Sequence, residues 1–209
     1  MTPWPWGRLA LAAAMALLCA CTTGEGQGEV TSDRLLVTDC WNGPFDLQPT
    51  FFGANPYRQQ TLFIRVQRGD DAVDVSDGLT VSIGDLEEVR ARRGESVRVG
   101  LPAGVSPPGV SRLAGATPAL VSMALYLHST CNRQNGVVYA VDGSITFDSL
   151  FSGDPNELEA SERLTEAHFD AEFADPRTIE SGASGDAVSQ VSGWFRFFFQ
   201  RGPPAQPFP

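Results

Sequence analysis

"LTEAHFDAEFAD", residues 164–175, alternates apolar and polar side chains along its whole length. In an extended chain, successive side chains point to opposite faces, so this alternation builds two different surfaces back to back. One surface carries Ala167, Phe169, Ala171 and Phe173, and the other carries Glu166, His168, Asp170 and Glu172. The stretch therefore predicts a β-strand with one side against a core and the other side in solvent.

The same period of two recurs elsewhere in the chain, with turn residues between the runs. Strands are expected in residues 61–69, 79–85, 120–128 and 191–202. Residues 87–101 predict a hairpin that turns at Arg93, Gly94 and Glu95. Residues 136–150 predict a second hairpin at Asp142 and Gly143, because Asp-Gly favours the two-residue turns that join antiparallel strands.

A helical pattern is found only in "DPNELEASER", residues 154–163, where Asp154 can cap a first turn that contains Pro155. Many short strands with turns at short intervals are typical of antiparallel all-β folds. We therefore predict an all-β fold, a single antiparallel β-sandwich with a barrel as the alternative, and at most one short helical turn.

The start of the chain has the pattern of an export signal. A weakly cationic start precedes an unbroken apolar run at residues 9–18, which fits the hydrophobic part of a secretory signal. The following "LCAC", residues 18–21, resembles the lipobox of bacterial lipoproteins, although position 19 is Cys where a small residue is usual. Cleavage before Cys21 presents the small Ala20 to the peptidase, so the resemblance implies acylation of the Cys21 thiol.

This resemblance implies a membrane anchor made by the acyl chains, since two or three chains hold a protein stably on a bilayer. Thr22 and Thr23 lack the aspartate that in this class signals retention in the inner membrane, which favours the outer membrane. The expected organisation is a signal peptide at 1–20, an acylated cysteine with a flexible tether at 21–33, a β-sandwich domain at 34–201 with a crossover loop at 102–118, and a Pro-rich tail at 202–209.

Composition narrows the possible functions. The net charge is −10, so the chain has no basic surface with which to replace the counterions of a nucleic acid. All 15 basic residues are arginine, which excludes Schiff bases and every other lysine chemistry.

Cys40 and Cys131 are expected to form a disulfide, as paired cysteines outside the cytoplasm usually do. The rival interpretation is a reactive thiol at Cys131 paired with His128.

Two groups of acidic residues are candidate metal sites. His168, Asp170 and Glu172 share a strand face, and their ligand types suit zinc, manganese or iron; the alternative is a solvent-facing side of an amphipathic strand. Calcium is the metal expected for the acidic loop, because carboxylate oxygens from a flexible segment suit it; the alternative is a solvated turn. The residues of this loop are Asp70, Asp71, Asp74 and Asp77.

Aromatic residues make a third candidate site. Trp194 and Arg196 share one face of a strand whose other face carries Phe195 and Phe197. Such a strand is either covered on both sides or presents an aromatic platform to a glycan or a protein partner. Trp41 and Tyr57 are further aromatic residues that loops can bring to such a platform.

The sequence contains no Gly-x-Ser-x-Gly elbow, no His-Glu-x-x-His and no phosphate-binding glycine loop. We therefore expect a membrane-anchored envelope lipoprotein with a non-catalytic binding or structural domain and without a cofactor, calcium excepted. The alternatives are a calcium- or glycan-binding surface module and a metal-dependent hydrolase that uses His168, Asp170 and Glu172. The expected partners are the membrane and an envelope protein or glycan.

Overall fold

The computed structural model describes residues 26–57, 60–69, 76–101, 119–132, 136–177 and 188–200. This part of the chain is mostly strand, which confirms the all-β prediction. The strands are β1 (Gly26–Val37), β2 (Trp41–Leu47), β3 (Phe51–Tyr57), β4 (Thr61–Gln67), β5 (Asp77–Ile83), β6 (Ser96–Arg98), β7 (Val121–Leu127), β8 (Val137–Ser149), β9 (Leu164–Ala174) and β10 (Val188–Phe198). Two short helices, α2 (Leu86–Ala91) and α3 (Ala160–Arg163), accompany them.

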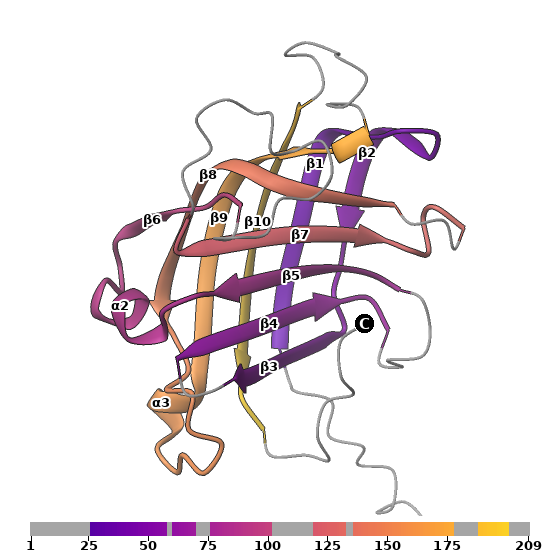
Figure 1. Cartoon of the computed structure of the whole chain (residues 1–209). Helices are drawn as coiled ribbons and strands as arrows, with labels where there is room; N and C mark the ends of the chain where they lie inside the picture. Colours follow the sequence, from indigo (N-terminus) through magenta and orange to yellow (C-terminus); the bar gives the residue numbers. More distant parts are fainter. Residues whose placement is uncertain are drawn as a thin grey trace, which may run out of the picture.

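All ten strands belong to one antiparallel sheet with the order β2-β1-β10-β9-β8-β7-β5-β4-β3, and β6 pairs with β8 beside this path. In Figure 1, β3, β4, β5 and β7 run across the front, while β1, β2, β9 and β10 run behind them in a crossing direction. The sheet is therefore curled upon itself into a half-barrel. It combines the two predicted architectures, because two layers face each other but belong to one continuous sheet.

Strand β8 forms the corner between the two halves of the sheet. Its start pairs with β7 through Val137–Tyr139, its other edge pairs with β9, and its later residues Ser144–Thr146 pair with β6. Between Ala140 and Asp142 the register with β9 shifts, and such bulges are the usual way for a strand to pass from one layer to the next.

The predicted hairpin at Asp142 and Gly143 is therefore wrong, because β8 continues through both residues as one bulged strand. Gly143 has a φ of 116°, and a Cβ atom there would lie 2.4 Å from the Cα of Ala171 on β9. The glycine is needed for this close approach and this backbone conformation rather than for a turn. The carboxylate of Asp142 accepts a hydrogen bond from the Gly143 N–H at 2.9 Å, which fixes the bulge locally.

The predicted hairpin at 87–101 is also wrong in its first arm, which is helix α2. Asp85 caps this helix by accepting a hydrogen bond from the Glu88 N–H at 3.0 Å. Leu86 and Val89 are buried one helical turn apart, so the period here is that of a helix and not of a strand. The turn itself is where the sequence places it, since Gly94 has a φ of 77° just before β6.

The helical segment expected at 154–163 is shorter and later than predicted. Asp154 caps a turn by accepting from the Asn156 N–H at 2.8 Å, and the four-residue helix α3 begins only at Ala160. With α2, the described residues contain two short helices where at most one was expected. Arg90 of α2 forms an ion pair with Glu162 of α3, so a charged contact links the two helices.

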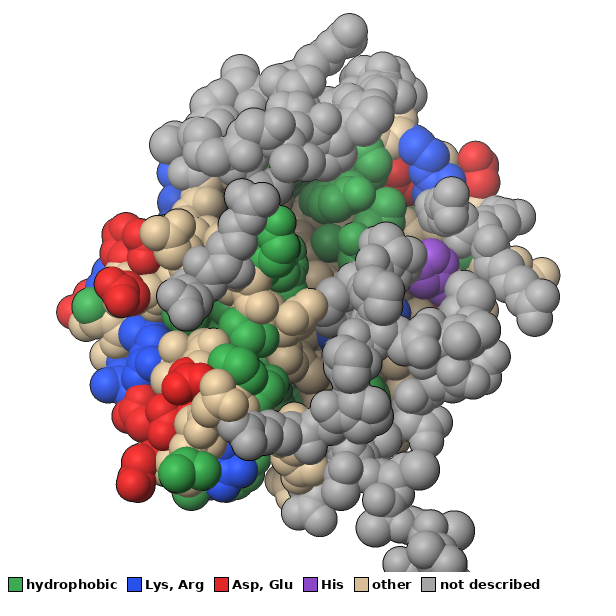
Figure 2. All heavy atoms as spheres, turned by 60° about the horizontal axis from the view of Figure 1, so that its bottom comes forward, with side chains coloured by type: hydrophobic (Ala, Val, Ile, Leu, Met, Phe, Trp, Pro, Cys, Tyr) green, Lys and Arg blue, Asp and Glu red, His purple; other side chains and the backbone are tan. Residues whose placement is uncertain are grey.

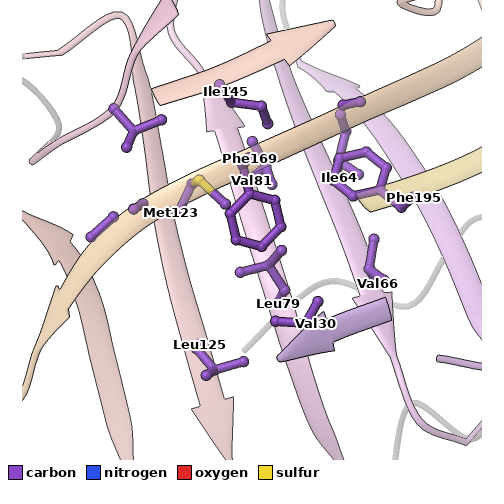
Figure 3. Packing of buried hydrophobic residues seen from close by; sticks show 14 of the residues in the cluster. Val30, Ile64, Val66, Leu79, Val81, Met123, Leu125, Ile145, Phe169 and Phe195 are labelled. Atoms are coloured by element: carbon purple, nitrogen blue, oxygen red, sulfur yellow. The ribbon is translucent and has the colours of Figure 1, made fainter. Parts of the chain in front are cut away.

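The core lies between the two crossed halves of the sheet. Alternate residues of each predicted strand are buried, as the period of two requires: Leu62, Ile64 and Val66 on β4; Leu79, Val81 and Ile83 on β5; Val121, Met123, Leu125 and Leu127 on β7; and Ala167, Phe169, Ala171 and Phe173 on β9. Figure 3 shows Phe169 and Phe195 from the rear half pointing into the same interior as Ile64, Val81 and Met123 from the front half.

The two ends of the sheet, β2 and β3, each contain a proline, Pro44 and Pro56, and proline suits an edge because it has no N–H to offer a further strand. On β2, the indole N–H of Trp41 donates to the carbonyls of Gly43 and Pro44, and Arg68 donates to the carbonyl of Asp46. These contacts occupy carbonyls of the edge strand, so pairing with a second chain is disfavoured at β2.

The tether predicted at 21–33 is wrong from residue 26 onward. Residues 26–33 belong to β1, which pairs with β10 on one side and β2 on the other. They look like a linker because they are small and polar, yet Gly26 lies where a Cβ atom would be 2.5 Å from the ring of Phe52. Strand pairing on both sides and this close packing override the low hydrophobicity of the segment.

Candidate functional site

One side of the rear half of the sheet points away from the core and carries most of the predicted site residues. We call this surface the outer face. It consists of Glu29 on β1, Trp194, Arg196 and Phe198 on β10, Glu166, His168, Asp170 and Glu172 on β9, and Thr146 and Asp148 on β8. The register aligns these residues in rows: Glu29 lies opposite Trp194, which lies opposite His168, which lies opposite Thr146.

Trp194 is 41% exposed and Phe198 is 37% exposed, while Phe195 and Phe197 on the opposite side of β10 are buried. Of the two alternatives, a strand covered on both sides is therefore wrong, because the outward side of β10 leaves two aromatic side chains partly exposed. Arg196 lies between Trp194 and Phe198 along the same face and forms an ion pair with Glu166, with Nε 3.3 Å from Oε2. The face thus combines a flat apolar surface with charges at its sides.

The predicted metal ligands His168, Asp170 and Glu172 share this face, but they do not assemble a metal site. His168 contacts Asp148 of β8, with Nδ1 3.3 Å from Oδ2, and Asp170 accepts a hydrogen bond from Gln190 of β10. Among the described residues, no group of three or more His, Cys, Asp or Glu side chains is placed to hold a metal ion. Alternate residues of a strand lie about 6–7 Å apart, and here the neighbouring strands supply partners that keep the side chains separate.

Of the acidic loop, Asp70, Asp71 and Asp74 lie outside the described residues, and Asp77 has a different role from the predicted one. Asp77 is buried, and its Oδ1 accepts hydrogen bonds from the backbone N–H groups of Ser129 and Thr130 at 2.9 and 3.0 Å. Its Oδ2 accepts from the hydroxyl of Thr130 at 2.7 Å. The carboxylate therefore stabilises the turn after β7, and both of its oxygens are already used.

Cys40 and Cys131 form a disulfide with Cα atoms 5.3 Å apart, which confirms the pairing predicted from the sequence. The bond joins the turn between β1 and β2 to the turn after β7, so it connects the two halves of the curled sheet. Each turn contains a residue with left-handed backbone beside its cysteine, Asp39 with a φ of 60° and Asn132 with a φ of 49°. The rival thiol–imidazole pair is excluded, and His128 instead stacks on Tyr126 with ring centres 5.9 Å apart.

Asp175, just after β9, holds the first of these turns and was not predicted. Its side chain is fully buried, and its Oδ2 accepts hydrogen bonds from the Thr38 N–H at 2.7 Å and from the Arg177 guanidinium at 2.8 Å. Burial alone raises the pKa of Asp175, but the hydrogen bonds from Arg177 and Thr38 outweigh it and hold that pKa below its usual range. The sequence gives little indication of this role, because a single Asp at the end of a strand forms no recognisable motif.

The front half of the sheet has an outward side of different character, with Arg65, Tyr126 and Tyr139 partly buried. Burial raises the pKa values of Tyr126 and Tyr139, and it lowers the pKa of the Arg65 guanidinium. In Figure 2, acidic and basic side chains gather on the left of the molecule, the side of α2 and α3, where Arg90 pairs with Glu162. The other predicted platform residues do not join Trp194, since Trp41 and Tyr57 lie on the edge strands β2 and β3.

The remaining predicted features lie outside the described residues: the signal peptide at 1–20, the anchor Cys21, the crossover loop at 102–118 and the tail at 202–209. The two residues that flank the crossover loop meet, because the Ala119 N–H donates to the carbonyl of Leu101 at 3.1 Å. Among the described residues, no helix has the length and apolar character needed to cross a membrane. Comparisons of the chain with protein-family models, curated proteins and solved structures found no match.

Proposed function

We propose that this chain is an acylated envelope protein, anchored at the outer membrane through Cys21, whose β domain binds a partner without catalysing a reaction. The observation that carries the proposal is the Cys40–Cys131 disulfide. Disulfides persist in oxidising compartments, so the bond agrees with the export signal and lipobox pattern at the start of the sequence. These two features are independent, because the signal lies in residues 1–21 and the bond lies in the folded domain.

The binding role is supported by the outer face. Interfaces between proteins are enriched in tryptophan, phenylalanine and arginine, and charged residues surround their centres. Trp194, Arg196 and Phe198 follow one another along a single strand face and are all solvent-accessible. The neighbouring strands on both sides keep this face rigid, which lowers the entropic cost of binding.

The anchor is tested by replacing each cysteine of the "LCAC" stretch in turn. Cells that express the chain are grown with labelled palmitate, and membranes are separated from soluble protein. We expect Cys21→Ala to abolish labelling and release the domain from the membrane, while the matched variant Cys19→Ala keeps both. Labelling that persists in Cys21→Ala, or a wild-type chain that takes up no label, would contradict the anchor.

A glycan-binding surface module is the second candidate function, favoured by the exposure of the Trp194 ring. Sugars stack on flat aromatic rings and use neighbouring polar groups for hydrogen bonds, and His168 and Glu29 flank this ring. The test is binding of neutral oligosaccharides, which Trp194→Ala should abolish.

Calcium binding by the segment around Asp70, Asp71 and Asp74 is tested by adding calcium during thermal unfolding, where an increase in Tm would support it.

A further inference from the structure

The outer face carries an excess of negative charge around its exposed tryptophan. Five of its residues are carboxylates and one is a cation, Arg196. The carboxylates are Glu29, Asp148, Glu166, Asp170 and Glu172. Glu166 is the partner of Arg196, with Nε 3.3 Å from Oε2, so the remaining carboxylates have no basic partner among the residues of the face, His168 beside Asp148 excepted.

Three of these carboxylates, including the Glu166 that pairs with Arg196, are neighbours of Trp194 in the sheet register. Glu29 lies directly across from Trp194 on β1, and Glu166 and Asp170 lie on either side of His168, its direct neighbour on β9. Adjacent strands are about 4.8 Å apart and alternate residues about 6–7 Å apart, so all three carboxylates are within reach of a group placed on the ring. An aromatic face attracts cations through its quadrupole, and nearby carboxylates add to that attraction.

The shape of the face favours a macromolecule over a small ligand. It is the outside of a curled sheet (Figure 1), whereas pockets for small molecules are concave. From Glu166 to Glu172 the acidic side chains of β9 extend over about 20 Å, the length of about six residues of extended peptide. A short extended segment with alternating basic residues therefore matches the spacing of the carboxylates along the strand.

We propose that the outer face is a docking surface for a basic, Arg- or Lys-rich segment of a partner protein, with Trp194 at its centre and the carboxylates of β1, β8 and β9 around it. This inference names the partner class for the proposed binding role and rests on that role. It does not depend on acylation at Cys21, so the two proposals can fail separately. The net charge of −10 also favours a basic partner.

The test is a titration of the full chain in detergent with a short peptide in which Arg or Lys alternates with small neutral residues, measured by isothermal titration calorimetry so that the readout does not depend on Trp194. We expect saturable binding that weakens by about tenfold or more when salt is raised from about 20 to about 200 mM, because screening shortens the reach of surface charges. Trp194→Ala should weaken binding by about tenfold or more. Its matched control is Trp41→Ala, which removes a tryptophan that is 37% exposed on edge strand β2.

The charges are tested by a pair of double variants that remove the same net charge. Asp170→Asn with Glu172→Gln removes two negative charges from the outer face, and Glu157→Gln with Glu159→Gln removes two from the segment before α3. We expect the first pair to weaken peptide binding by about fivefold or more and to flatten its salt dependence, and the second to change neither. Asp170, Glu172 and Glu159 are exposed and Glu157 is partly exposed, and a glutamine at 157 keeps the side-chain oxygen that accepts from the Leu158 and Glu159 N–H groups. Unchanged circular dichroism is therefore expected for both variants.

Three results would overturn the inference. Equal weakening by both double variants would show general attraction to an acidic protein rather than a docking surface. Binding that survives Trp194→Ala would remove the centre of the proposed site. Failure of the basic peptide to bind, with salt-independent binding of neutral oligosaccharides that requires Trp194, would assign the face to a glycan instead.

Discussion

The Cys40–Cys131 disulfide allows a stability prediction whose size follows from the chain topology. The bond closes a loop of 91 residues and joins the two halves of the sheet. We predict that replacing both cysteines by alanine leaves the folded structure in place, because each turn has an anchor of its own. Asp77 holds the turn after β7 through three hydrogen bonds, and Asp175 holds the turn between β1 and β2.

Since the folded state keeps these anchors, the loss of stability arises mainly in the unfolded state. In the chain-entropy model, a cross-link that closes a loop of 91 residues lowers the entropy of the unfolded chain enough to stabilise the fold by about 4–5 kcal/mol. Domains of this size are stable by about 5–15 kcal/mol. The double variant is therefore expected to lose a large fraction of its stability while still folding in the absence of denaturant.

The assay is urea unfolding, followed by far-UV circular dichroism and by tryptophan fluorescence. The variant should have a lower midpoint and a larger m value, since an unfolded chain without the cross-link exposes more surface. Reductant should shift the wild-type midpoint toward that of the variant and leave the variant itself unchanged. This second comparison separates the bond from the packing of the cysteine side chains.

A double variant within about 1 kcal/mol of the wild type, with the same m value, would refute the reasoning. It would mean that the unfolded chain is already held compact by other interactions, so that the cross-link removes little entropy. A variant that loses its far-UV signal without denaturant would refute it in the opposite sense. In that case the bond would be needed to hold the two halves of the folded sheet together.

Three further predictions concern single residues. Gly143→Val should destabilise the domain by about 2–4 kcal/mol in urea unfolding, because a side chain there has a forbidden backbone conformation and collides with β9. Asp175→Asn should cost more stability at neutral pH than at acidic pH, because the pKa of Asp175 is lowered in the folded state. The stabilisation by the Asp175 carboxylate is complete above the unfolded-state pKa of about 4 and declines as the pH falls toward the folded-state pKa. Equal losses of stability at both pH values would contradict this prediction. Phe195→Ala, in the core, should cost about 3–5 kcal/mol, whereas Phe198→Ala, on the outer face, should cost about 1 kcal/mol or less, which the two midpoints compare directly.

The sequence predicts those strands whose local pattern and tertiary surroundings agree. On β9 the alternation of Ala167 and Phe169 with Glu166 and His168 matches the buried and exposed sides of the strand in the structure. The predictions fail where contacts distant in sequence decide the outcome. Asp142 and Gly143 have the local preferences of a hairpin turn. Strand β8 nevertheless continues through them, because it pairs with β9 on one edge and with β6 on the other.

In the candidate site, too, the sequence pattern predicts which residues share a face but not which side chains they contact. That His168, Asp170 and Glu172 share a face follows from their spacing alone. Whether they converge on a metal depends on residues of the neighbouring strands. Asp148 of β8 contacts His168, and Gln190 of β10 donates a hydrogen bond to Asp170, so these two side chains have other partners. Such cross-strand neighbours follow from the sheet register, and no local pattern in the sequence specifies it.

The position of β1 links the proposed anchor to the proposed docking surface. Because β1 begins at Gly26, four residues separate the start of the sheet from Cys21, and the five steps of the chain from Cys21 to Gly26 can span at most about 18 Å. Trp194 lies opposite Glu29, three residues along β1, which adds about 10 Å. An anchor at Cys21 would thus keep the docking surface within about 30 Å of the lipid. Such an anchor would therefore restrict the partner to basic segments that themselves lie close to the membrane. Under this proposal, a flexible insert after Cys21 should relax that restriction without changing the affinity for the basic peptide.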